Sequence, residues 1–267
     1  MAEPLTSRRP FRIGGLLRTA VLAVALLGFL VPVAGAAVFG FTVPGKAGAT
    51  LDNLAAVLTS AGAGDALDMT MLLAVLSTLA TLALLLPTLL VLHLHGTARL
   101  RHLAESLSLL PLVVPSVTLV SGAGLFFHAT MPGFLVSPLS LVPFYVVLCL
   151  PLAYRALDAQ LRAADLRTLW AASSSLGAGS LRTLVRVVLP VLRTSLLSAA
   201  LMCVALVLSE FAVASLLLHF TFPVYTVQAG GSSPRGAAAL SFLTMMITWL
   251  LLSGISWLAQ RRKRTES

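Results

Sequence analysis

Long apolar runs separated by short polar segments dominate this chain. Each run has 18 or more residues, and together they lie at about 16–40, 69–92, 106–128, 139–156, 195–218 and 237–259. A helix rises about 1.5 Å per residue, so a run of this length crosses a hydrocarbon layer about 30 Å thick. Backbone groups cannot stay unpaired in lipid, so all six runs are expected to be helical. The pattern predicts an all-α integral membrane protein with six transmembrane helices.

The composition supports this prediction. Hydrophobic residues make up 58% of the 267 positions and charged residues only 10%, whereas a soluble domain carries roughly a quarter charged residues. The third run contains Pro111 and Pro115. Proline lacks a backbone N–H, so kinks or local breaks are expected in that run. Neither an internal repeat nor a low-complexity linker divides the sequence, which indicates one membrane domain.

Positive charge is distributed unevenly among the polar segments, and this predicts the orientation. With the N-terminus inside, 16 of the 18 Lys and Arg residues are cytoplasmic and only Lys46 and Arg235 lie outside. Cytoplasmic segments are typically enriched in positive residues. Both termini, the turn at 93–104 and the loop at 155–193 are therefore predicted to be cytoplasmic. The net charge of +9 follows from this topology, so we expect a lipid bilayer and no nucleic acid as partner.

The N-terminal part has two interpretations. In the favoured one, residues 1–15 are a cytoplasmic segment and 16–40 are an uncleaved first transmembrane helix. The alternative is a cleaved leader, because TSRRPFR resembles the start of a twin-arginine export signal. The charge pattern leaves cleavage open. At the other end, 260–267 form a basic cytoplasmic tail.

Sequence motifs for catalysis are missing. The sequence has no G-x-x-x-x-G-K-[ST], H-E-x-x-H or G-x-S-x-G, and no two carboxylates share an apolar run. Cys149 and Cys203 lie inside apolar runs, where small core residues are expected. The histidines of the turn (His93, His95 and His102) are interpreted as interfacial polar residues. We therefore expect a protein that is not an enzyme and has no cofactor or metal.

The loop at 155–193 is the longest polar stretch. It holds six Arg residues and two acids, between segments that are almost entirely apolar. Residues 159–176 are predicted to form a helix with one apolar face. Gly177 and Gly179 then end it, as glycine commonly does at helix C-termini.

A second, shorter helix is predicted after these glycines. Ser180 is a suitable cap for a helix at 181–189, which Pro190 would close. The loop then forms a helix–turn–helix elbow at the cytoplasmic surface. Trp170 and the valines of LVRVVLP make this elbow too apolar for a freely solvated loop.

Glu210 is the only acid well inside a predicted span. It lies about fifteen residues into the fifth run, about 22 Å from the cytoplasmic side. An ionisable group in a span is costly and usually faces a cavity or a partner. Two interpretations stay open: a wall of a translocation pathway, or a packing residue held by hydrogen bonds with help from Ser209 and Ser215.

The run WAASSSLGAGSLRTLVRVVLP resembles the cytoplasmic "EAA" loop of permease subunits in bacterial binding-protein-dependent ABC importers. That pattern is Glu-Ala-Ala, three residues, Gly, nine residues, then Ile-x-Leu-Pro. Gly177 matches the glycine. Nine residues later Leu189 and Pro190 match the end of the pattern, with Val187 in place of its Ile. The start departs from it, since Ala171 occupies the glutamate position. The coupling residues that the resemblance implies are Ala171, Ala172, Ser173, Leu176, Gly177, Ala178, Gly179, Ser180, Val187, Leu189 and Pro190.

The resemblance covers roughly 69–259, with a coupling loop at 157–194 and the first helix as an extra span. It implies the type I importer permease fold in a bacterial inner membrane, in the branch serving polyamines, iron, thiamine or phosphonates. It also implies three kinds of protein partner: two ABC ATPase subunits that receive the 169–190 loop, a second permease subunit, identical or related, and an extracytoplasmic solute-binding protein. The chain would form half of the solute pathway.

Two other classes of function predict sequence features that differ from these. A stand-alone secondary transporter or channel would be expected to carry several intramembrane ionisable residues or inverted repeats. An intramembrane enzyme would need a catalytic set, which the sequence lacks. The permease function is therefore the expectation.

Overall fold

The structure, a computed structural model, describes residues 13–45 and 48–265. The predictions for residues 1–12, for Lys46 and for the last two residues of the tail lie outside the described residues. The described chain is helical and contains no strand. Its elements are α1 (Ile13–Phe41), α2 (Asp52–Leu58), α3 (Ala63–His95), α4 (Ala98–Val113), α5 (Ser116–Thr130), the short η1 (Pro138–Ser140), α6 (Leu141–Ala163), α7 (Leu166–Ser175), α8 (Ser180–Thr183), the π turn η2 (Leu184–Val188), α9 (Leu189–Ser209), α10 (Ala212–Leu216), α11 (Phe222–Ser232) and α12 (Pro234–Thr265).

The number of helices that can cross a membrane agrees with a multi-pass protein. Five helices in the described part are long and apolar enough, and a sixth is obtained if α4 and α5 count as one span. These two helices meet at an angle of 99°. The single helix predicted at 106–128 is therefore wrong, while the break expected from its prolines is confirmed. Pro115 biases Val114 towards extended backbone, and Val114 has φ −84° and ψ 119°.

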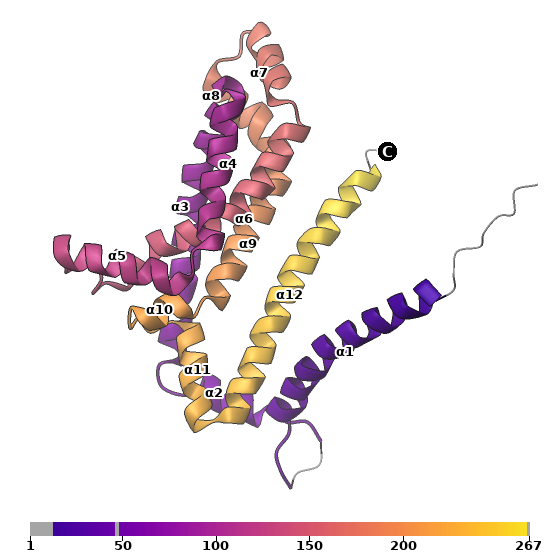
Figure 1. Ribbon diagram of the computed structural model, residues 1–267, viewed down its shortest axis with the longest axis vertical. Helices are drawn as coiled ribbons and strands as arrows, with labels where there is room; N and C mark the ends of the chain where they lie inside the picture. Colours follow the sequence, from indigo (N-terminus) through magenta and orange to yellow (C-terminus); the bar gives the residue numbers. More distant parts are fainter. Residues whose placement is uncertain (1–12, 46–47, 266–267) are drawn as a thin grey trace, which may run out of the picture.

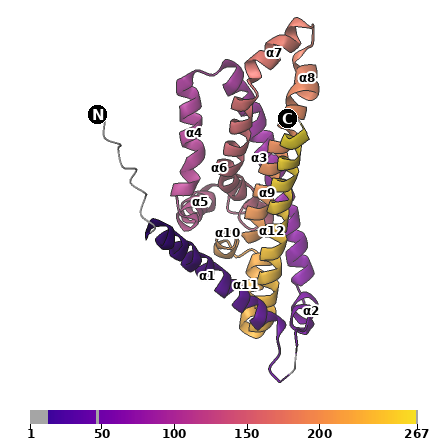
Figure 2. The same cartoon turned by 90° about the vertical axis from the view of Figure 1, so that its right-hand side faces the viewer.

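Three long helices, α3, α6 and α9, form the core of the bundle (Figure 1). Their facing residues include fully buried Leu89, Tyr145, Leu157 and Leu192. The α7–α8 hairpin projects beyond one end of this bundle. The α3–α4 turn and the C-terminal part of α12 lie towards the same end (Figures 1 and 2). Three of the basic segments that the charge pattern assigned to one side of a membrane thus gather at one end.

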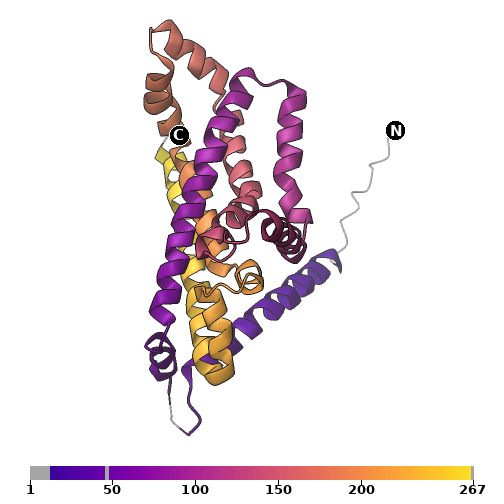
Figure 3. The same ribbon diagram turned by 90° about the vertical axis from the view of Figure 1, so that its left-hand side faces the viewer.

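The first helix joins the bundle at the opposite end, where α1 meets α2 and α12 (Figure 3). Arg235 donates from Nη1 to the carbonyl oxygen of Thr42 at 2.8 Å, and its guanidinium lies 4.6 Å from the centre of the Phe39 ring. Asn53 donates to the carbonyl of Gly40 at 2.9 Å. The last carbonyls of a helix have no partner within it, so these side chains complete the end of α1 and hold it on the bundle.

Candidate functional site

The elbow is present at one end of the bundle, with helix bounds that differ from the prediction. The helix expected at 159–176 is two helices, because α6 ends at Ala163 and α7 starts at Leu166. Between them Asp165 has φ 43°, a left-handed conformation that interrupts a helix. The predicted single helix is wrong at that point.

The second helix of the elbow also differs from the prediction. The helix starts at Ser180, so Gly179 holds the N-cap position and no side chain caps it. It does not close at Pro190, because α8, η2 and α9 run on as one span from Ser180 to Ser209. Proline cannot donate to the carbonyl four residues earlier. The wide π turn just before it accommodates this missing bond, and such turns often occur at functional sites.

The glycine turn is confirmed. Gly177 has φ +78°, which glycine adopts without steric cost. Its N–H donates to the carbonyl of Ser174 at 2.9 Å, and the N–H of Ala178 donates to the carbonyl of Ser173 at 3.1 Å. This pair of bonds is the Schellman motif that ends helices at a glycine. The sharp reversal of the chain between α7 and α8 depends on it.

The two arms of the elbow are joined by a buried hydrogen bond. The hydroxyls of Ser173 on α7 and Thr183 on α8 are 2.8 Å apart, and both side chains are buried. Trp170 and Leu184 pack against the main core, and Val188 is fully buried in it. The elbow is therefore a packed unit attached to the bundle, as its apolar residues predicted.

The tip of the elbow presents apolar side chains to the outside. Leu176 and Leu181, one on each side of the turn, are 88% and 75% exposed. Leu181 was not among the predicted coupling residues. Those other than Leu176 divide into three groups. Half-buried positions are Ala178, Val187 and Leu189, and exposed positions are Ala171, Ala172, Gly177, Gly179, Ser180 and Pro190. Ser173 alone is buried.

A polar network underlies the elbow, and the sequence did not predict it. His93 on α3 lies 2.8 Å from Asp158 on α6, measured from Nε2 to Oδ1, and both side chains are buried. A carboxylate only accepts, so Nε2 of His93 is the donor. Arg162 donates from Nε to the other oxygen of Asp158 at 2.8 Å and lies 3.4 Å from Glu105 on α4. The network therefore joins α3, α4 and α6.

Arg167 extends this network to the elbow. It projects from α7 and donates to the carbonyls of His93 at 2.9 Å and Gly96 at 3.4 Å. These carbonyls belong to the last turn and end of α3. We call His93, Glu105, Asp158, Arg162 and Arg167 the base network. It ties the first arm of the elbow to the helices of the core.

Glu210 is not inside a continuous helix. The fifth run predicted at 195–218 ends as a helix at Ser209, and a short helix, α10, follows. Both carboxylate oxygens of Glu210 accept from the N–H of Val213, at 3.0 and 3.2 Å, at the start of α10. Ser209 bonds to backbone carbonyls of α9 instead. Glu210 is half-buried and lines a cavity of about 430 Å³, so it is both a helix cap and a cavity wall.

Comparison with known proteins adds no relative to this description. No family model matches the chain, and a search of curated proteins returns no significant match.

Proposed function

We propose that the chain is the permease subunit of an ATP-binding-cassette importer. It forms half of a solute pathway together with a second permease, identical or related. It hydrolyses nothing itself, and the 169–190 loop couples it to a separate ATPase. A solute-binding protein delivers the solute from outside.

The apolar tip of the elbow is the observation that supports this proposal most. Two leucines exposed by 75% or more lie at the end of the bundle where basic segments gather. Leucine side chains exposed to water at the end of a bundle are unfavourable for an isolated chain. They are suited to insertion into an apolar groove of a partner protein. The glycine turn and the buried bond between Ser173 and Thr183 give the tip a fixed shape. A fixed shape reduces the entropy lost on binding.

The base network provides the mechanical link that the proposal needs. ATP binding closes the ATPase dimer, and the docked elbow moves with it. The ATPases drive this change because they bind the two states of the permease with different affinity. Arg167 on α7 bonds to the end of α3, and Asp158 bonds α3 to α6. A displacement of α7 therefore reaches α3 directly and α6 through the bond between His93 and Asp158.

A stand-alone secondary transporter remains the second candidate, because one observation favours it. Such proteins bind solute where helices are discontinuous in the membrane, and the chain has breaks between α4 and α5 and between α9 and α10. The two candidates differ in their dependence on an ATPase.

Cysteine crosslinking tests the docking role of the elbow. In membranes that contain the chain and a candidate ABC ATPase partner, Ala178→Cys and Ser180→Cys are expected to crosslink to the ATPase. Both positions are expected to resist a membrane-impermeant reagent added from outside. Ala61→Cys is the matched control, an exposed position between α2 and α3 at the opposite end of the bundle. It should be labelled from outside and should not crosslink to the ATPase. Labelling of position 178 from outside would contradict the topology.

A further inference from the structure

The second arm of the elbow carries two arginines on its outer surface. Arg182 lies on α8 and Arg186 on η2, and both side chains are exposed. Leu181 and Val185, which directly precede the arginines, are exposed as well. Residues four apart lie on one face of a helix. The outer face of this arm is therefore a strip in which apolar and positively charged side chains lie side by side.

The positive charge of this strip has no counterpart in the chain. No Asp or Glu occurs from 166 to 193. Within the described part of the chain, neither Arg182 nor Arg186 forms a salt bridge or a side-chain hydrogen bond. Arg167 on the first arm differs, because it bonds to carbonyls at the end of α3. The two arginines of the second arm are thus available to a partner.

The position of these two arginines is electrostatically unfavourable for the isolated chain. Like charges four residues apart on a helix repel each other. The arginines also lie near the start of the long span from Ser180 to Ser209, and the start of a helix is its positive end. No acidic residue occupies the first turn. Negative charge supplied from outside the chain would reduce both penalties.

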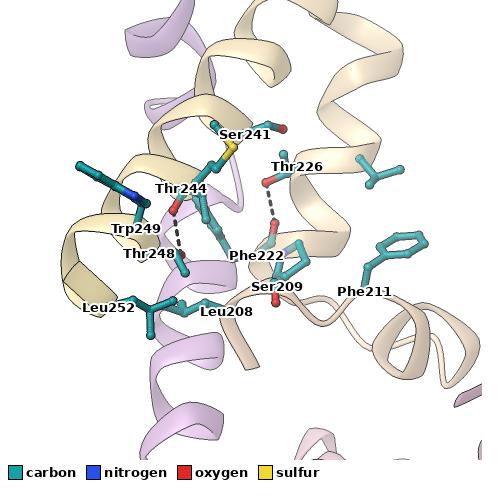
Figure 4. A pocket seen from close by; sticks show the side chains of 13 residues that line it. Leu208, Ser209, Phe211, Phe222, Thr226, Ser241, Thr244, Thr248, Trp249 and Leu252 are labelled. Atoms are coloured by element: carbon teal, nitrogen blue, oxygen red, sulfur yellow. Dashed lines mark hydrogen bonds between the residues drawn. The ribbon is translucent and has the colours of Figure 1, made fainter. Parts of the chain in front are cut away.

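A cavity between α9, α11 and α12 gives no comparable information about a partner. It has a volume of about 530 Å³, and no Asp, Glu, His, Lys or Arg lines it (Figure 4). The hydroxyls of Thr226, Thr244 and Thr248 in its wall each donate to the carbonyl four residues earlier on their own helix. Unpaired charge therefore indicates a partner at the elbow and not at this cavity.

We infer that the ATPase groove that receives the elbow carries carboxylates beside an apolar floor, and that Arg182 and Arg186 pair with these carboxylates. This inference rests on the proposed function, because it names the chemistry of the ATPase surface. Leu176 and Leu181 contact the apolar floor, while each guanidinium can bind a carboxylate through two parallel hydrogen bonds. Ala171 stands where the EAA pattern has glutamate and carries no charge. The arginines supply the charged contact of this elbow, with the opposite sign.

Binding of the ATPase to charge variants tests this inference. The full chain is placed in nanodiscs of neutral phosphatidylcholine, and the Kd of a candidate ABC ATPase partner is measured at low and high salt. For the parent we expect the Kd to rise about tenfold at high salt, because salt screens ion pairs near a surface. At low salt, Arg182→Glu and Arg186→Glu should each raise the Kd about tenfold. Arg182→Lys keeps the charge and should raise it less.

Arg99→Glu is the matched control. It makes the same change of charge at an exposed position on α4, at the same end of the bundle. Its Kd should stay within about twofold of the parent value. On the partner, the acidic residue nearest to the Ala178→Cys crosslink is replaced by Lys. This ATPase variant should bind Arg182→Glu more tightly than the unchanged ATPase does.

A Kd that is insensitive to salt and to both glutamate variants, or equally sensitive to Arg99→Glu, would overturn the inference. An effect seen only in nanodiscs that contain phosphatidylglycerol would also overturn it, because the arginines would then bind lipid headgroups. In these cases the ATPase still binds, and the proposed function stands. Absence of binding by the parent, together with no crosslink at position 178, would instead contradict the proposed function and the inference with it.

Discussion

Gly177→Val is expected to uncouple ATP hydrolysis from transport. The φ of +78° at this position is strongly unfavourable for a β-branched residue, by about 2 kcal/mol. A penalty of this size lowers the ratio of the docking-competent elbow to its other conformations more than tenfold. In vesicles that hold the permease, its ATPase and the binding protein, the amount of solute imported per ATP hydrolysed should fall about tenfold, while basal hydrolysis continues.

Gly179→Val separates backbone conformation from side-chain size. Gly179 lies two residues away in the same turn, and an added Cβ meets no atom within 4 Å at either glycine. Its φ of −71° suits any residue. The loss of coupling should therefore be much smaller at 179 than at 177. Equal losses would show that side-chain bulk, and not the left-handed turn, is what matters at the tip.

Asp158→Ala is expected to have the largest effect on stability. It leaves the buried His93 without its hydrogen-bond partner and removes the carboxylate that holds Arg162. Removing one member of a buried polar pair costs about 3 kcal/mol. For a chain of this size the Tm should fall by about 6–12 °C. The two buried cysteines provide the measurement, because they react with a thiol-specific dye only once the bundle unfolds.

Two variants serve as controls for the base network. Asp158→Asn keeps one side-chain oxygen that can accept from His93 or Arg162, so it should lose less stability than the alanine variant. Asp68→Ala removes an exposed acid and should change the Tm by no more than about 1–2 °C. If Asp158→Ala unfolded at the same temperature as the parent, the base network would not hold α3 and α6 together.

Local features of the elbow could be predicted from the sequence, since glycine and proline act on their own backbone. Gly177 ends a helix because only glycine adopts its φ without cost, and Pro115 breaks the third run for an equally local reason. Helix bounds that depend on packing against other elements are harder to predict from the sequence. Asp165 interrupts the predicted helix although an aspartate in that pattern does not signal a break.

Long-range partners could not be predicted. Asp158 and Arg162 are four residues apart, a spacing that indicates an ion pair on a helix. Nothing in the sequence places His93, 65 positions earlier, against the same carboxylate. The sequence does not decide between the two roles of Glu210 for the same reason. Its cavity exists because two breaks far apart in the chain meet, and only the packing of α5 on α10 brings them together.

Solute uptake with and without the ATPase tests the central proposal most directly. Vesicles containing this permease, its permease partner and the binding protein are loaded with ATP, and uptake of the radiolabelled ligand of the binding protein is measured. The coupling function of the elbow predicts uptake only when the ATPase is present and ATP is hydrolysed. Uptake at the same rate without the ATPase would contradict it and would identify a stand-alone transporter.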